Sequence, residues 1–94
     1  MCIVLIPMIN QFLLTEFGER IRQLRQEKGI SQEALAGETG FHRTYIGMIE
    51  RGERNISLTN MAVFAKVFKL NLSRLLSLEK VSKDHDFQKY QVKS

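Results

Sequence analysis

Residues 31–52, SQEALAGETGFHRTYIGMIERG, predict two short helices joined by a tight turn. Ser31 can cap the first helix, because its hydroxyl can accept a hydrogen bond from a free backbone N–H of the first turn. Ala34 and Leu35 begin an apolar face. Gly40 is expected to end this helix, since a left-handed backbone costs glycine almost nothing.

The second helix of this stretch is expected from about His42 to Glu50. Ile46 and Ile49 lie one turn apart and are expected to face inward. The polar first turn of the helix then points outward, and it consists of Arg43, Thr44 and Tyr45. A helix that presents these side chains near its N-terminus suits the major groove of DNA.

The composition allows one small domain with one core. The chain has 94 residues, 44% of them hydrophobic, and a formal net charge of +4. Global disorder is disfavoured by that apolar content, and the basic charge weakly favours a polyanionic partner. Cys2 is the single cysteine, which excludes an intramolecular disulfide and indicates a reducing cytoplasm. No apolar run is long enough to span a bilayer.

Residues 1–10, MCIVLIPMIN, form an apolar leader that Pro7 interrupts. No basic residue precedes the apolar run, as a signal peptide would require. Three interpretations stay open. The leader is flexible or loosely packed, with Met8 as an alternative start, it is a short strand that pairs with its copy in a dimer, or it targets a membrane.

Residues 11–78 are expected to form the folded domain, and its first helix begins at Gln11 or Thr15 and ends at Lys28. Apolar residues recur there at helical spacing, namely Leu14, Phe17, Ile21 and Leu24. Gly29 is the expected left-handed stop.

Two further helices follow residues 31–52. One is capped by Ser57 and runs to about Lys69, with Met61, Phe64, Ala65 and Phe68 as its buried stripe. The other is capped by Asn71 and covers Leu72 to Leu78, with Leu75 and Leu76 inward. The polar residues 79–94 predict a frayed tail. The prediction is therefore an all-α, five-helix domain.

The order of these residues resembles the lambda-repressor-like, XRE-type helix-turn-helix family over roughly residues 17–76. The resemblance rests on GERIRQLRQEKGISQEALAGETG, RTYIGMIERGERN and ISLTNMAVFAKVFKLNLSRLL. Within that family, HRTYIGMIERGERNISL is most similar to the controller proteins of restriction–modification systems. Two residues depart from the pattern. Thr39 replaces an apolar residue, and Lys69 replaces a helix-ending glycine. A left-handed Lys would cost about 1 kcal/mol, which favours a different turn there.

The resemblance implies a helix-turn-helix in which the second helix reads DNA bases. Arg43 is predicted to place its guanidinium as a fork on O6 and N7 of guanine, with a phosphate contact or no contact as the alternatives. Thr44 offers a methyl group and a hydroxyl to a base edge or a phosphate. Tyr45 is expected to contact a base or a phosphate, or to pack against the start of the preceding helix.

Other polar residues are predicted to contact the DNA backbone. Gln32 lies where the family contacts a phosphate or supports the recognition helix, and a helix N-terminus favours anions by itself. His42 is a helix cap or a phosphate neighbour. The remaining candidates follow the recognition helix, where a solvated charged loop is the alternative; they are Arg51, Arg54 and Asn55.

The resemblance also implies that Arg25 pairs with Glu50 and holds the recognition helix at its angle. Loss of one partner would cost about 3–5 kcal/mol if the pair is buried, whereas an exposed pair contributes about 0–1 kcal/mol.

A homodimer on a palindromic operator is expected, because one such helix reads few base pairs and a two-fold axis repeats the half-site at about 34 Å. Leu72, Leu75 and Leu78 are the candidate dimer residues.

Glu33 and Glu38 are either contacts for RNA polymerase or solvated helix charges. An antitoxin-like protein-binding module is the alternative function. No catalytic constellation, cofactor motif or metal-ligand spacing indicates an enzyme, and the DHD cluster at 84–86 is a weak metal candidate.

Overall fold

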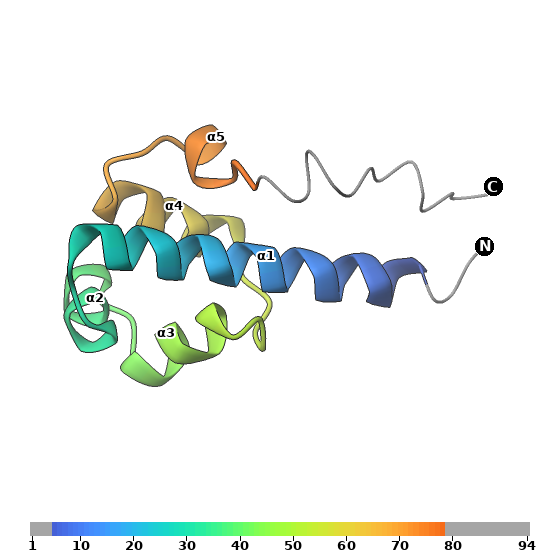
Figure 1. Cartoon of the computed structure of the whole chain (residues 1–94), viewed down its shortest axis with the longest axis horizontal. Helices are drawn as coiled ribbons and strands as arrows, with labels where there is room; N and C mark the ends of the chain where they lie inside the picture. Colours follow the sequence, from blue (N-terminus) through green and yellow to red (C-terminus); the bar gives the residue numbers. More distant parts are fainter. Residues whose placement is uncertain (1–4, 79–94) are drawn as a thin grey trace.

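The computed structural model describes residues 5–78, and the side chains from residue 7 onward. These residues form five α-helices and no strand, which confirms the predicted all-α fold (Figure 1). The helices are α1 (Leu5–Lys28), α2 (Gln32–Thr39), α3 (Arg43–Glu50), α4 (Leu58–Val67) and α5 (Leu72–Leu75). The predicted tail at 79–94, its DHD cluster and Cys2 lie outside the described residues. No described helix combines the length and the apolar character needed to cross a bilayer.

The first helix begins earlier than its sequence predicts. Helix α1 starts at Leu5 rather than at Gln11 or Thr15, so Pro7 is its third residue. Proline is tolerated in a first turn, because the N–H groups there have no partner within the helix. The strand considered for residues 1–9 therefore does not form over residues 5–9. The N-terminal half of α1 projects beyond the other helices (Figure 1).

The four later helices begin at the predicted caps. Ser31 accepts from the backbone N–H of Ala34 at 3.0 Å. The other three cap residues, which also accept from backbone N–H groups through their side chains, are His42, Ser57 and Asn71. Gly29 and Gly40 have φ of 74° and 81°, as predicted for helix ends that need a left-handed residue. Local sequence thus fixes the boundaries of the two helices that form the central motif.

The two residues that depart from the family pattern behave differently from each other. Thr39 donates its hydroxyl hydrogen to the carbonyl oxygen of Leu35 at 2.9 Å and accepts from the N–H of Phe41 at 3.1 Å. Its hydroxyl thus bonds to backbone groups on both sides of the turn between α2 and α3. Lys69 has φ of 58°, so the turn after α4 keeps the left-handed conformation and the different turn expected there is wrong. The N–H of Leu70 still donates to the carbonyl oxygen of Ala65 at 2.8 Å across this turn.

One hydrophobic core joins the five helices. Its buried members are Phe17, Ile21, Leu35, Ala36, Ile46, Ile49, Phe64, Ala65 and Leu75. Phe64 is fully buried, and its ring lies 6.4 Å from that of Phe17 and 5.3 Å from that of Phe41, centroid to centroid. Two predicted core positions are wrong: Ala34 is exposed, with Ala36 buried in its place, and Leu76 is 40% exposed.

Candidate nucleic-acid interface

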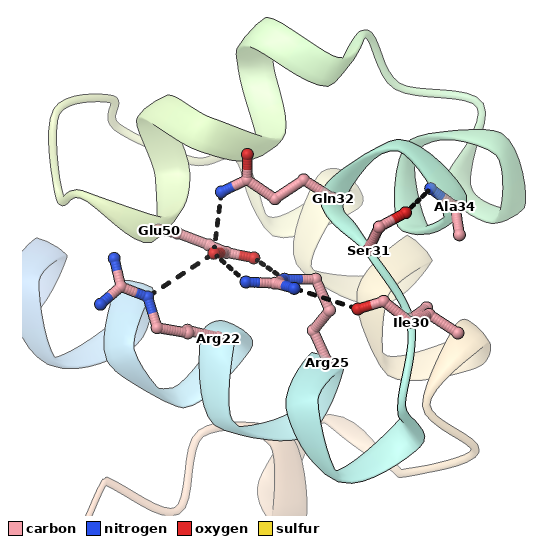
Figure 2. A network of polar contacts seen from close by, with 7 residues as sticks. All are labelled: Arg22, Arg25, Ile30, Ser31, Gln32, Ala34 and Glu50. Carbon is pink, nitrogen blue, oxygen red and sulfur yellow. Dashed lines mark hydrogen bonds and ion pairs between the residues drawn. The ribbon is translucent and has the colours of Figure 1, made fainter.

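Helix α3 is anchored at its C-terminal end by a buried carboxylate. The side chain of Glu50 has no exposed surface. Arg25 of α1 donates its Nε to Oε2 of Glu50 at 2.7 Å and its Nη2 to Oε1 at 3.1 Å. The resulting two-pronged ion pair, implied by the resemblance, is present in the structure (Figure 2). Such a fork fixes the direction of both side chains as well as their distance.

Two more side chains complete the surroundings of this carboxylate. Gln32, the first residue of α2, donates its Nε2 to Oε1 of Glu50 at 3.1 Å. The Nε of Arg22 lies 3.7 Å from the same oxygen. Arg25 also donates Nη1 to the carbonyl oxygen of Ile30 at 3.0 Å. A buried charge is tolerated when it is paired and hydrogen-bonded in this way. One carboxylate therefore connects α1, α2 and α3 (Figure 2).

A glycine allows α1 to approach this end of α3 closely. A Cβ atom added to Gly18 would lie 2.4 Å from the carbonyl oxygen of Ile49 and 2.7 Å from that of Glu50. Both atoms belong to the backbone, so they cannot move aside as a side chain would. Helical periodicity does not mark Gly18 as a packing residue, because it follows side chains and glycine has none.

The N-terminal end of α3 is exposed, as predicted. Arg43 and Thr44 are the first two residues of the helix, and both are exposed. His42 accepts the backbone N–H of Thr44 on its Nδ1 at 3.2 Å, which makes it the helix cap. The Nε of Arg43 lies 3.7 Å from Oε1 of Glu33, an ion pair that the sequence analysis did not predict.

Tyr45 is half-buried and has a structural role. Its ring packs edge-on against Phe41, 5.1 Å between centroids. Its hydroxyl accepts from Nδ2 of Asn60 in α4 at 3.0 Å. The guanidinium carbon of Arg54 lies 5.7 Å from the ring centroid, within the range of a cation–π contact. The ring of Tyr45 therefore packs on Phe41 and contacts Arg54, and its hydroxyl bonds to α4.

The loop after α3 holds the remaining candidates at the surface. Arg51 donates Nε to Oε2 of Glu53 at 3.0 Å. This hydrogen bond raises the pKa of Arg51 above its ordinary value. Asn55 is exposed, and its Oδ1 accepts the N–H of Ile56 at 3.2 Å. Arg51, Arg54 and the start of α3 thus supply exposed positive charge.

The structure changes the set of candidate dimer residues. Leu75 is fully buried in the core of its own chain, so its assignment to a dimer interface is wrong. Leu72 and Leu78 are half-buried, and Leu72 packs against that core. Arg20 donates Nη2 to the carbonyl oxygen of Arg74 at 2.7 Å and thereby ties the end of α5 to α1.

Within the described part of the chain, no group of three possible metal ligands occurs.

Comparison with protein families identifies the class to which this arrangement belongs. A family model described as helix-turn-helix matches residues 21–75. The chain therefore belongs to the helix-turn-helix family, whose members are DNA-binding transcription regulators.

The similar proteins include restriction–modification controllers, which confirms the predicted resemblance. Control protein C.BamHI from Bacillus amyloliquefaciens is 48% identical over 61 residues, covering 64% of this chain and 75% of that protein. The crystal structure of the controller protein C.AhdI from Aeromonas hydrophila gives a TM-score of 0.63 at 45% identity, covering 66% of this chain and 94% of that chain. The C.Esp1396I controller tetramer in complex with its natural 35-base-pair operator gives a TM-score of 0.60 at 32% identity, covering 69% and 95%.

Proposed function

We propose that this chain is a sequence-specific, dimeric DNA-binding transcriptional regulator that controls a restriction–modification operon. The observation that carries the proposal is the exposed Arg43–Thr44 edge on a helix whose other end is locked by Glu50. A reading helix needs a fixed backbone and exposed side chains, and α3 has both. The similarity to C.BamHI and C.AhdI supports the controller role.

The proposed base contacts come from the first turn of α3. Arg43 takes a guanine through O6 and N7, because a guanidinium fork matches these two acceptors. Thr44 takes a thymine methyl or a neighbouring acceptor. Tyr45 is half-buried and contributes its exposed surface to the groove wall, since its hydroxyl already accepts from Asn60.

The proposed phosphate contacts flank the reading helix. Arg51 and Arg54 donate to phosphates beyond the end of α3, and Asn55 and His42 lie next to the same backbone. Gln32 directs one amide hydrogen to Glu50. Its second amide hydrogen, together with the N-terminus of α2, is available to a phosphate. These contacts position the protein, whereas base contacts select the sequence.

Dimerisation follows from the size of the reading surface. One helix contacts few base pairs, so two copies on a palindrome are needed, with half-sites about 34 Å apart. Leu72 and Leu78 remain candidates for the interface, and the exposed Leu76 joins them. The structure of the C.Esp1396I tetramer on its operator is a precedent for self-association in a similar protein.

The remaining parts of the proposal concern the cellular location of the protein and its partners. We assign the regulator to the cytoplasm, where its DNA target lies. Contact with RNA polymerase through Glu33 or Glu38 stays a prediction, and both carboxylates have a basic partner within the chain. The similarity to controller proteins favours regulation over an antitoxin-like module, and no enzymatic activity is proposed.

Selection of bound DNA from a random pool tests this function with the full chain. The proposal predicts enrichment of a palindrome whose half-site centres lie about one helical turn apart. Absence of enrichment, or enrichment of a single unrepeated site, would contradict it. Inspection of the neighbouring genes tests the controller role separately, because that role predicts a methyltransferase and a nuclease beside this gene.

A further inference from the structure

We propose that Glu33 determines specificity by holding Arg43 ready for guanine and away from phosphate. The inference rests on the proposed function, since it concerns how the same reading edge distinguishes an operator from other DNA. It assigns a role to a residue that the base and phosphate contacts above do not use.

The pair joins the first turns of the two helices of the motif. Glu33 is the second residue of α2, and Arg43 is the first residue of α3. The side chain of Glu33 is 78% exposed and that of Arg43 is 61% exposed, with Nε of Arg43 3.7 Å from Oε1 of Glu33. Exposed ion pairs contribute little to stability, so Glu33 can be replaced without unfolding the domain.

The direction of the contact matters for base reading. The carboxylate faces Nε of Arg43. The two terminal nitrogens of the guanidinium are the pair that can fork onto O6 and N7 of guanine. A guanidinium restrained by Glu33 has less freedom to lose when it binds guanine, which lowers the ordering that binding requires.

The same carboxylate disfavours unspecific binding. Attraction between cationic side chains and phosphates supplies nearly all of the affinity for unrelated DNA. In an unspecific complex Arg43 contacts an anionic phosphate, which a negative charge beside the guanidinium repels. At the operator Arg43 contacts a guanine, which carries no net charge, so the same carboxylate costs less there. Glu33 thus increases the ratio of specific to unspecific affinity.

A matched control exists on the same helix. Glu38 is also an exposed carboxylate of α2, and its Oε1 lies 3.3 Å from Nζ of Lys28 in α1. Glu33→Gln and Glu38→Gln change the net charge equally. Only the first of these changes removes the charge next to the reading guanidinium.

The experiment measures the affinity of the full chain for a selected operator duplex and for an unrelated duplex at one salt concentration. Glu33→Gln is expected to tighten binding to the unrelated duplex and to reduce the ratio of the two affinities roughly fivefold, the range of one exposed ion pair. Glu38→Gln is expected to leave that ratio unchanged. Circular dichroism of both variants checks that the helices remain.

Three results would overturn the inference. An unchanged ratio for Glu33→Gln, or an equal drop for both variants, would show that Glu33 acts only through the net charge. A larger ratio of operator affinity to unspecific affinity for Glu33→Gln would show that the carboxylate opposes the recognition of guanine by Arg43. These outcomes differ from failure of the proposed function, in which the unaltered chain would select no sequence at all.

Discussion

The two ends of α3 differ in burial, pairing and freedom of the side chains. At the C-terminal end, Glu50 has no exposed surface and is bonded to Arg25 and Gln32. At the N-terminal end, Arg43 is largely exposed, and its contact with Glu33 joins two exposed side chains. The difference indicates that the two ends of this eight-residue helix have separate roles. One end fixes the backbone of the helix, and the other end presents side chains that can exchange partners.

Removal of the anchor should have the largest effect. Glu50→Ala leaves Arg25 as a mostly buried charge without its partner, so we expect a loss of about 3–5 kcal/mol in the free energy of unfolding. Denaturant titration measures this loss. Arg22→Ala is the control, because Arg22 is 48% exposed and lies 3.7 Å from Glu50; its expected loss is about 0–1 kcal/mol. Equal, small losses for both variants would contradict the anchoring role of Glu50.

A smaller effect is expected where α1 meets the anchored end. Gly18→Ala places a Cβ against the backbone carbonyl oxygens of Ile49 and Glu50, which should destabilise the fold by about 1–3 kcal/mol. Gly37→Ala is the matched control, since no atom lies within 4 Å of its added Cβ and the site is inside a helix. That control should stabilise the fold by about 0.5–1 kcal/mol. A neutral or stabilising Gly18→Ala would show that α1 does not need this close approach.

Substitutions at the exposed end should change the salt dependence of DNA binding rather than the free energy of unfolding. The logarithm of DNA affinity is expected to fall with the logarithm of salt concentration by about 0.9 per phosphate neutralised. Arg54→Gln should therefore reduce this slope by about 0.9, with little change in stability. Arg74→Gln is the control, because α5 and α3 lie on opposite sides of α1 (Figure 1). A slope unchanged by Arg54→Gln would exclude Arg54 as a phosphate contact.

The features that sequence predicted well are local ones. The caps at Ser31 and His42, and the left-handed Gly40 between α2 and α3, depend on residues within three positions of each other. The buried faces of α3 and α4 follow from helical periodicity. The pair of Arg25 and Glu50 spans 25 positions, and only the resemblance to a family suggested it.

The features that sequence missed have a local cause in one case and depend on packing between distant residues in the others. Pro7 predicts an interruption of the leader, whereas the first turn of a helix tolerates proline. Helix α5 has only four residues, too few for periodicity to decide that Leu75 is buried and Leu76 is not. The contact between Glu33 and Arg43 depends on how α2 and α3 cross, which neither helix encodes alone.

The exposed end of α3 is expected to read bases while its other end is held by the fold. The measurement compares the affinity of the unaltered chain and of Arg43→Ala for the selected operator and for duplexes in which each base pair is replaced in turn. Arg43→Ala should lose about 1–3 kcal/mol of binding free energy, and this loss should disappear when one guanine of the half-site is already replaced. Its free energy of unfolding should be unchanged. An equal loss on every duplex would rule out base reading by Arg43, because Arg43 would then contact a phosphate.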